Sequence, residues 1–227
     1  MEHTDKLIGL WPAAGLRARS GPLELRWIND RLLAELAELA AEGIHAPGQM
    51  PFTVPWSRGT KDQVARNVLE YQWAVRSQVG PGKLVLEMAV LLDGVPVGVQ
   101  AASGDNWAIL RSVETGSWLG RAQQGRGLGT RMRALMLHLL FDGLHAREVR
   151  STAFADNHAS NAVSIKTGYL PDGRFRDVRE GAPVTVNRYR MDVERFGHRR
   201  DSLAGLLGAP VEISGAEPVR DRLAGAG

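Results

Sequence analysis

The order of strand-like and helix-like segments in the middle of the chain constrains the fold most strongly. Two apolar, strand-like runs at 84–92 and 95–102 are joined by an Asp-Gly dipeptide at 93–94, which is typical of a tight β-hairpin turn. A third strand-like run at 112–119 leads into a glycine-rich turn and an amphipathic helix over 125–144. This order predicts a mixed sheet whose front half is antiparallel, in the α/β class.

The remaining periodic segments extend this sheet on both sides. Three helix starts carry N-cap signals: Asn29, the capping-box pair Thr60 and Gln63, and Asn157. The whole pattern predicts an α+β arrangement, with a mixed, mostly antiparallel central sheet flanked by about four helices. Gly116, inside the third strand, indicates a bulge or a close backbone approach. In chain order, the further elements that we expect are a strand at 23–28, helices at 30–43 and 60–78, a strand at 148–155, a helix at 158–167 and strands at 170–176 and 183–191.

The two ends of the chain carry weaker patterns. Residues 1–20 are interpreted as an irregular N-terminal extension, residues 21–195 as one domain and residues 196–227 as a C-terminal tail. Glycine, alanine and proline become frequent beyond about residue 203, which predicts a poorly ordered end. The N-terminus lacks the apolar stretch of a secretory signal, and no run approaches the roughly 20 apolar residues of a membrane helix. We therefore expect a cytoplasmic protein without a membrane partner.

Composition removes several kinds of site. The 227-residue chain contains no cysteine, which excludes disulfides, thiolate metal ligands and a cysteine nucleophile. His138 and His145 lie seven residues apart on the long helix without clustered carboxylates, so we expect no metal site. The net charge is only +3, and few aromatic residues accompany the arginines at 174–190. A nucleic-acid partner is therefore not expected.

The string at 118–130 carries the clearest chemical signal. Gly125, Gly127 and Gly129 let the backbone present successive N–H groups, and the start of the following helix adds partial positive charge, so the turn is suited to phosphate groups. It is not a Walker-type loop, because the Gly-Lys-Ser/Thr ending is missing. It also departs from the dinucleotide pattern G-x-G-x-x-G, and the strands before it look antiparallel. The remaining interpretation is Gln124-x-x-Gly127-x-Gly129, a shorter turn around a pyrophosphate.

Several motifs together resemble the GNAT family of N-acetyltransferases. Gln124-x-x-Gly127-x-Gly129 resembles the family's acyl-CoA pyrophosphate loop, and the string VETGSWL at 113–119 resembles the E-x-G-x-W-L strand of its RimJ/RimL branch. The string MPFTVPW at 50–56 resembles an actinobacterial subgroup, some of whose members favour succinyl-CoA over acetyl-CoA. A further motif is similar to the family signature on its last helix and consists of Asn157, Ser160, Val163, Gly168 and Tyr169.

The resemblance implies a fold and a cofactor site. The sheet of this family splays between its fourth and fifth strands, here those at 112–119 and 148–155, and the pantetheine arm of CoA inserts there. Residues 21–195 are then a GNAT acyltransferase domain, in which the backbone of 125–130 holds the pyrophosphate. The implied cofactor contacts are Trp118, Leu119, Gly120, Gln124, Gly125, Arg126, Gly127, Leu128, Gly129, Thr130, Asn157 and Ser160.

The implied reaction moves an acyl group from a CoA thioester to a primary amine by direct attack in a ternary complex. An amine that is protonated at neutral pH must lose a proton before it attacks, and the leaving thiolate needs a proton or a hydrogen bond. Glu114 stands where the RimJ/RimL branch often places a carboxylate, so it is the candidate base, directly or through water. Ser164 occupies the position of the family's donor to the thiolate, and a buried structural serine is the alternative.

The acceptor side is less determined. The donor is acetyl-CoA or succinyl-CoA, and the acceptor is a protein N-terminus, a lysine or a small amine. The apolar loop at 44–59 packs over the core or over a ligand. We expect a homodimer or a higher homo-oligomer. The alternative to an acyltransferase function is a catalytically idle acyl-CoA-binding regulatory module. The candidate substrate contacts are His45, Phe52, Trp56, Arg58 and Arg111, of which the two arginines would meet a succinyl carboxylate.

Overall fold

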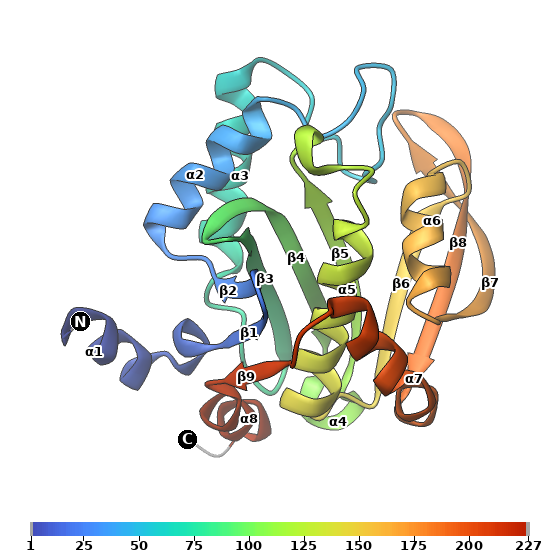
Figure 1. Ribbon diagram of the computed structural model, residues 1–227. Coiled ribbons are helices and arrows are strands. Elements are labelled where there is room, and N and C mark those ends of the chain that lie inside the picture. Colours follow the sequence, from blue (N-terminus) through green and yellow to red (C-terminus); the bar gives the residue numbers. More distant parts are fainter. Residues whose placement is uncertain (1, 226–227) are drawn as a thin grey trace.

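A nine-stranded sheet forms the centre of the molecule in the computed structural model, which describes residues 2–225, with side chains from residue 6 onward (Figure 1). The strand order is β7-β8-β6-β5-β4-β3-β2-β1-β9, and the neighbours are antiparallel except β5 and β6. The mixed, mostly antiparallel sheet is therefore confirmed. The strands are β1 (Arg17–Ser20), β2 (Leu23–Trp27), β3 (Lys83–Leu92), β4 (Val95–Asp105), β5 (Ser112–Leu119), β6 (Glu148–Phe154), β7 (Leu170–Arg179), β8 (Ala182–Asp192) and β9 (Glu212–Ser214).

Helices cover the two faces of the sheet unequally (Figure 1). The helices α5, α6 and α7 lie on one face, whereas α2 and α3 pack together on the other face, next to β3 and β4. The second face of β5, β6, β8 and β7 carries no helix (Figure 1). The helices are α1 (Glu2–Leu10), α2 (Asp30–Ala41), α3 (Lys61–Val75), α4 (Trp107–Leu110), α5 (Leu128–His138), α6 (His158–Lys166), α7 (Val193–Leu207) and α8 (Ala216–Ala224), with 3₁₀ turns at Pro12–Gly15 and Arg121–Gln123 and a π-helical turn at Leu139–Gly143.

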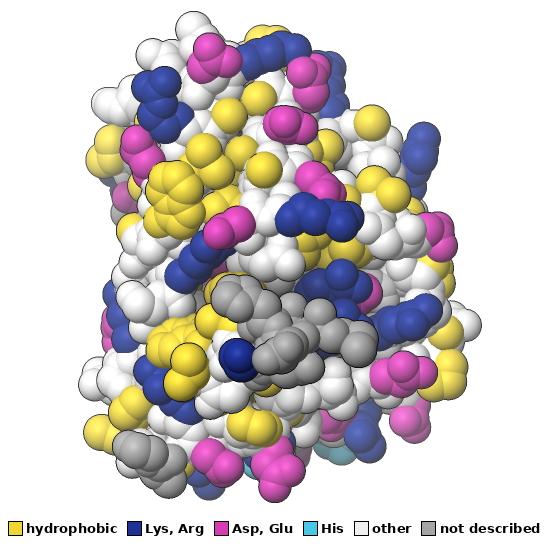
Figure 2. All heavy atoms as spheres, turned by 90° about the vertical axis from the view of Figure 1, so that its left-hand side faces the viewer, with side chains coloured by type: hydrophobic (Ala, Val, Ile, Leu, Met, Phe, Trp, Pro, Cys, Tyr) yellow, Lys and Arg dark blue, Asp and Glu magenta, His cyan; other side chains and the backbone are white. Residues whose placement is uncertain are grey.

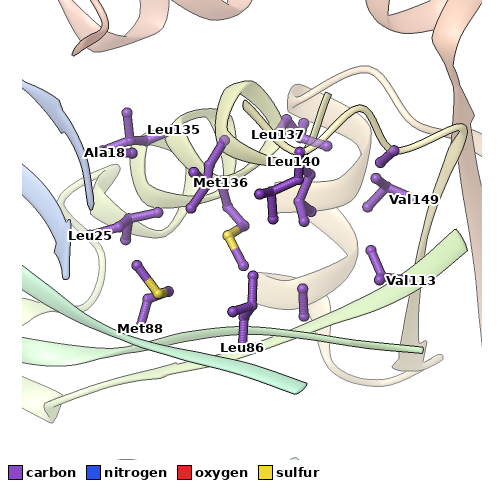
Figure 3. Close-up of a cluster of buried hydrophobic side chains, with 14 of the residues drawn as sticks. Ala18, Leu25, Leu86, Met88, Val113, Leu135, Met136, Leu137, Leu140 and Val149 are labelled. Carbon is purple, nitrogen blue, oxygen red and sulfur yellow. The ribbon is translucent and has the colours of Figure 1, made fainter. Parts of the chain in front are cut away.

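The alternating side chains of β3 divide the core into two clusters. Leu86 and Met88 point toward α5 and contribute to the larger cluster, where Met136 fills the space between helix and sheet (Figure 3). Ala89 and Leu91 point to the opposite face and pack under α2 and α3. Because successive side chains of a strand face opposite sides, a fully apolar strand is expected where both faces are covered by helices.

Local sequence signals fixed several element boundaries as expected. The Asn29 side chain accepts a hydrogen bond from the backbone N–H of Leu32 at 2.9 Å, which caps α2. Thr60 and Gln63 form the reciprocal capping box that starts α3. The Asp-Gly dipeptide at 93–94 forms the tight turn between β3 and β4, with positive φ at both residues.

The N-terminal segment is ordered, so its description as irregular is wrong. It forms α1, a 3₁₀ turn and β1, and β1 pairs with β2 and β9. Leu16 and Ala18 are buried in the main core, whereas Arg17 and Arg19 are exposed. This alternation over only four residues makes a real strand, which was too short to stand out in the sequence.

The C-terminal segment is also ordered, so the expectation of a poorly ordered end beyond residue 203 is wrong as far as residue 225. Leu203 and Leu207 of α7 and Val219 and Leu223 of α8 are at most 3% exposed and belong to the main core. Each pair is spaced by four residues, which places both members on one helix face. The domain limits at residues 21 and 195 stay a prediction, although strands from both flanking segments extend the same sheet. Residues 226–227 lie outside the described part.

The surface of the described residues carries charges of both signs. On the face seen in Figure 2, basic and acidic side chains are interspersed, with hydrophobic groups between them. Within residues 2–225, no helix is long and apolar enough to cross a membrane.

Candidate functional site

Strands β5 and β6 separate halfway along their length. They pair in parallel only over 112–115 on β5 and 148–151 on β6. Beyond these residues β5 continues beside β4 alone, and β6 beside β8. The separation forms part of a cleft with a volume of about 310 Å³, lined by residues of both strands, α5, α6 and the loop at 44–59. The expected splay between the strands at 112–119 and 148–155 is therefore confirmed.

Gly116 directly follows Thr115, the last residue of β5 that pairs with β6. Its pairing with β4 is in unbroken register, and a Cβ atom placed there would meet no atom within 4 Å. The expected bulge and the expected close backbone approach are therefore both wrong. Because glycine has no side chain, the surface of the sheet is instead uncovered at the point where β5 and β6 separate.

The turn after β5 offers an unusual run of free backbone donors. Gly125 and Gly127 have φ values of 74° and 76°, which only glycine adopts without strain, and α5 begins at Leu128 instead of at residue 125. Within the described structure, the backbone N–H groups of residues 125–129 have no hydrogen-bond partner in the protein. Successive free N–H groups at a helix N-terminus form a site for phosphate oxygens, so these residues fit the diphosphate group of CoA.

Two residues of the same motif serve the protein itself. The Gln124 side chain donates hydrogen bonds to the carbonyl oxygens of Leu119 at 2.9 Å and Ile44 at 2.6 Å, so it ties the turn to β5 and to the loop at 44–59. A Cβ atom on Gly129 would lie 3.4 Å from Val163, so this residue lies where α5 contacts α6. Arg126 is exposed beside the free donors.

Asn157 and Ser160 line the cleft from the start of α6. The Asn157 side-chain oxygen accepts a hydrogen bond from the backbone N–H of Ser160 at 3.1 Å, which is the expected helix cap. Trp118 and Leu119 line the cleft from β5. The cap occupies the oxygen of Asn157, so its amide N–H groups are the part that a ligand in the cleft can use.

Arg133 is a buried cation that sequence reasoning missed. It is 3% exposed, lines the cleft from α5, and is hydrogen-bonded only to neutral groups: Ser151 at 3.1 Å, Ser117 at 3.4 Å and Gln100 at 3.4 Å. No ion pair of Arg133 is present in the described part of the chain. A buried guanidinium without a carboxylate is costly, so this position favours an anion in the cleft. Its position six residues after Gly127 carries no signal that separates it from the other arginines of the helix.

Ser164 lies behind the cleft and does not line it. The residue is fully buried, and its hydroxyl donates to the Ser151 hydroxyl at 3.3 Å. Ser151 in turn accepts from Arg133. Tyr169, buried in the same region, shares a hydrogen bond with Thr115, and burial raises the pKa of its phenol. Ser164 is thus connected to the cleft through its hydrogen bond to Ser151, which is hydrogen-bonded to Arg133. Its role at the thiolate stays a prediction.

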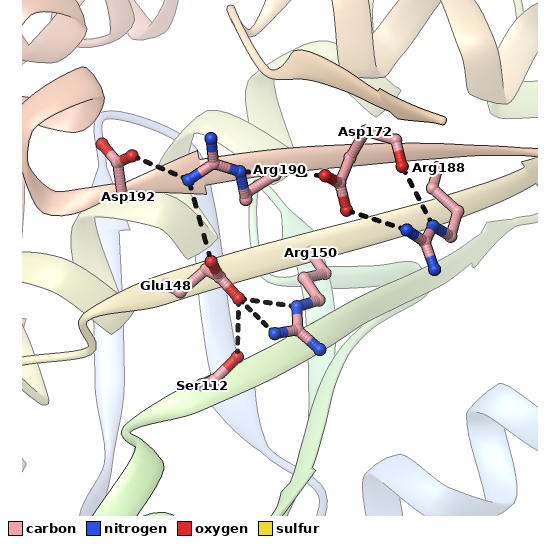
Figure 4. A network of polar contacts seen from close by, with 7 residues as sticks. All are labelled: Ser112, Glu148, Arg150, Asp172, Arg188, Arg190 and Asp192. Atoms are coloured by element: carbon pink, nitrogen blue, oxygen red, sulfur yellow. Dashed lines mark hydrogen bonds and ion pairs between the residues drawn. The ribbon is translucent and has the colours of Figure 1, made fainter. Parts of the chain in front are cut away.

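Glu114 is exposed on the helix-free face of β5. Its carboxylate accepts a hydrogen bond from the Thr152 hydroxyl at 2.5 Å, and Thr152 lines the cleft. The neighbouring strands on this face carry a network of ion pairs that includes Glu148, Arg150 and Arg190 (Figure 4). Glu114 therefore stands between this charged surface and the mouth of the cleft.

A second, mostly apolar cavity of about 660 Å³ adjoins the cleft. It lies between α3, the loop at 44–59 and the sheet, and it shares Phe52, Gly116, Ser117 and Trp118 with the cleft. The Trp56 ring contacts Phe52 and Trp118, with centroids 5.1 and 5.9 Å apart. The cavity size is that of a small-molecule site. The loop at 44–59 therefore covers both a cavity and part of the core.

The candidate acceptor residues divide between this site and other places. His45 lines the cleft and is hydrogen-bonded to Ser57 at 2.7 Å, while Phe52 and Trp56 line the apolar cavity. Arg58 instead forms a bidentate ion pair with Glu180 at the β7–β8 turn, at 2.9 and 3.0 Å. Arg111 precedes β5, at the end of the strand opposite the glycine-rich turn.

Glu87 is the second residue that sequence reasoning missed. It lies on β3 inside the apolar run, is half-buried, and lines the apolar cavity. Its carboxylate accepts hydrogen bonds from Tyr71 at 3.0 Å and Gln72 at 3.2 Å. Burial raises the pKa of the Glu87 carboxyl to about 7, although these two hydrogen bonds act in the opposite direction. The available signal was a lone acid within a strand that is otherwise apolar.

Among the described residues, no group of three His, Asp or Glu side chains is arranged to hold a metal ion.

Comparison with known proteins agrees with this geometry. The model of the acetyltransferase (GNAT) domain family matches residues 23–170. Mycobacterium smegmatis RimJ, solved in complex with CoA-disulfide, is similar with a TM-score of 0.72 at 21% identity, covering 89% of this chain and 97% of that chain. RimL, a ribosomal L7/L12 alpha-N-protein acetyltransferase in complex with coenzyme A, is similar with a TM-score of 0.62 at 21% identity, covering 78% and 97%.

A third solved structure shares the fold at lower similarity. The microcin C7 self immunity acetyltransferase MccE, in complex with acetyl-CoA and AMP, has a TM-score of 0.58 at 16% identity, covering 76% of this chain and 93% of that chain. At these identities the likeness shows a common fold. The family model, in contrast, spans well over half of the sequence and includes the glycine-rich turn, the splayed strands and α6. The chain belongs to the GNAT family of acetyltransferases, with RimJ and RimL among its structural neighbours.

Proposed function

We propose that the protein transfers an acyl group from acyl-CoA to a primary amine by direct attack in a ternary complex. The observation that carries this proposal is the junction of two cavities at Gly116–Trp118. One cavity leads to the free N–H groups of residues 125–129, and the other is apolar and large enough for a small acceptor. A donor and an acceptor can therefore meet at one place without a covalent enzyme intermediate.

The chain's own groups suit a CoA thioester at several points. The free N–H groups and the partial positive charge at the start of α5 suit the diphosphate, with Arg126 beside them. The cleft between β5 and β6 suits the pantetheine arm, for which Asn157 offers amide donors. Transfer is tested by incubating the purified protein with acetyl-CoA and a panel of amines and measuring free thiol. Tight acyl-CoA binding without transfer to any amine would instead support the regulatory module.

Glu114 is proposed to accept the proton of the attacking amine, directly or through water. We expect Glu114→Gln to lower kcat by about 10²-fold or more, and most strongly at low pH, where deprotonated amine is scarcest. The measurement is the pH–rate profile of the variant. Glu148→Gln makes the same change on the adjacent strand, inside the ion-pair network of Figure 4, and should leave the profile unaltered. An unaltered profile in Glu114→Gln would remove the residue from the base role.

Arg133 is proposed to stabilise the anionic sulfur that forms when the acyl group leaves. We expect Arg133→Met to lower kcat by about 10²-fold while the affinity for acetyl-CoA is kept, because a preorganised donor acts mainly where charge develops. The protein should remain folded, since an apolar residue of similar volume is tolerated where a buried charge is removed. The measurement combines single-turnover rates with calorimetric titration. Loss of succinyl-CoA affinity alone would instead assign Arg133 to a succinyl carboxylate.

Arg58 and Arg111 give no support to succinyl-CoA as the donor. Arg58 is paired with Glu180, and Arg111 lies at the far end of β5, so neither of the two expected cations faces the cleft. Titration with acetyl-CoA, succinyl-CoA and free CoA side by side tests the donor preference. A homo-oligomeric state and a cytoplasmic location stay predictions, and light scattering on the purified protein tests the first.

A further inference from the structure

The described lining of the apolar cavity beside the cleft contains acidic side chains but no basic ones. Its walls are aromatic, with Phe52, Trp56, Tyr71 and Trp118 around it. Glu70 and Glu87 are the charged residues that line it in the described structure, and no lysine or arginine does so. An aromatic cavity with acidic groups and no cation suits a positively charged guest with an apolar body.

The floor of the cavity connects Glu87 with the cleft. Glu87 on β3 is in register with Ala101 on β4, and Ala101 is in register with Gly116 on β5, so all three face the same side of the sheet. Ala101 and Gly116 have the smallest side chains, so no side chain of this row stands between the Glu87 carboxylate and the point where β5 and β6 separate. Two strand spacings put the Cα atoms of Glu87 and Gly116 about 10 Å apart.

Because Glu87 and Gly116 are two strands apart, they contact different parts of an acceptor. An amine that attacks a thioester in the cleft must lie near Gly116, so it does not lie on the Glu87 carboxylate. A group that is hydrogen-bonded to the Glu87 carboxylate lies about 3 Å from it and is therefore distinct from the nitrogen that attacks beside Gly116. Glu87 is therefore placed to hold the far end of an acceptor and not its reacting end.

We infer that the acceptor is a diamine whose two nitrogens are joined by an apolar spacer, with one ammonium group held by Glu87 and the other nitrogen presented to the cleft beside Gly116. This inference rests on the proposed acyl transfer and names its substrate class. Tyr71 and Gln72 already hold the carboxylate by hydrogen bonds from α3, so its position is fixed before a ligand arrives. The aromatic walls then contact the spacer.

The charged groups around Glu87 support a cation as its partner. Arg76 lines a smaller cavity together with Glu87; its Nη1 is paired with Asp30 and its guanidinium stacks over Trp27, whereas its Nε and Nη2 are buried without a hydrogen-bond partner in the described structure. Tyr71 contacts the carboxylate as a neutral phenol, and burial raises the pKa of that phenol. Glu70 lies at the exposed rim. In the described structure Glu87 thus has hydrogen bonds but no ion pair.

A matched pair of probes tests the inference. We compare p-xylylenediamine, which has two aminomethyl groups on one ring, with 4-methylbenzylamine, which lacks the second nitrogen. The wild-type protein should have a KM for the diamine about 10–100-fold lower than for the monoamine, because a hydrogen bond between charged groups is lost in the monoamine. Glu87→Gln should remove this difference, whereas Glu70→Gln, which changes the same charge at the rim, should largely keep it.

The pH dependence gives a second readout. Only the ionised carboxylate of Glu87 attracts an ammonium group, so the affinity for the diamine should rise with pH toward about 7, by no more than its advantage over the monoamine, and then level off. The monoamine should lack this step.

The stability of the protein should also depend on pH through Glu87. The pKa of its carboxyl rises from 4.5 to about 7 on folding, so the folded protein binds a proton that the unfolded chain releases, and the native stability falls as the pH rises through this window. Glu87→Gln is always neutral and should be at least as stable as wild type at pH 8.

Binding is measured separately from transfer, by quenching of the tryptophan fluorescence in the presence of CoA. Diamine binding that depends on Glu87 but gives no acyl transfer would sink the proposed function and leave this site in place. Transfer to amines with the same KM for both probes, in wild type and in Glu87→Gln, would overturn the inference and leave the proposed function in place. Transfer only to peptide N-termini or lysines would also overturn it.

Discussion

Gly127→Glu is expected to abolish acyl-CoA binding while the fold survives. Gly127 stands immediately before α5, in the middle of the free N–H groups of residues 125–129. A carboxylate there competes for these donors and repels phosphate oxygens at the point where the helix would attract them. We expect the Kd of acetyl-CoA, measured by calorimetric titration, to rise by at least about 100-fold, which corresponds to roughly 3 kcal/mol.

Backbone strain alone does not account for such a loss, and a matched variant separates the two effects. Gly94, in the β3–β4 turn, has a φ of 79° against 76° for Gly127, and a Cβ atom at either position meets nothing within 4 Å. Glutamate at each position therefore costs a similar strain of about 1–2 kcal/mol. Gly94→Glu should keep full CoA affinity. Equal affinities in both variants would refute the assignment of the turn after β5 to the diphosphate.

The parts of the fold that sequence could predict are those with local causes. The caps at Asn29 and Asn157 and the box at Thr60 each depend on a side chain and a backbone group three residues away, so the signal and the structure lie together. The Asp-Gly turn at 93–94 is similar. The splay between β5 and β6 came from a family resemblance, because nothing in either strand alone indicates where pairing stops.

The parts that sequence could not predict depend on neighbours distant in the chain. Glu87 becomes a site residue only because β3, β4 and β5 align it with Ala101 and Gly116, and strand register is not visible in a single strand. Arg133 is distinguished by the absence of a nearby carboxylate, which requires the positions of Ser117 and Ser151. Ser164 was assigned by its offset from the helix cap, and the offset does not reveal that its hydroxyl is enclosed.

Composition misled most clearly at the C-terminus, where Gly, Ala and Pro masked the end of α7 and the whole of α8. Residues of this segment reach the sheet as well, since β9 pairs with β1 over Glu212–Ser214. Its buried residues belong to the main core, so the segment contributes to the stability of the fold. A single substitution can test this role.

Leu203→Asp is expected to unfold the protein or to bring it close to unfolding. Leu203 is fully buried in the main core, on the face of α7 that packs against α5. Truncation of such a leucine to alanine costs about 2–5 kcal/mol, and aspartate adds the burial of a carboxylate without a partner. The total approaches the 5–15 kcal/mol that stabilises a typical domain. Urea denaturation followed by circular dichroism measures the effect.

Leu206 provides the control on the same helix, three residues further along the chain. Leu206 is 39% exposed. Leu206→Asp therefore makes the same change in helix propensity and charge as Leu203→Asp but buries no carboxylate, so the free energy of unfolding should change by no more than about 1 kcal/mol. A segment that hung free of the core would show the same small effect for both variants. A large loss in Leu203→Asp alone, accompanied by loss of CoA affinity, would show that α7 supports α5 and, through it, the donor groups at its N-terminus.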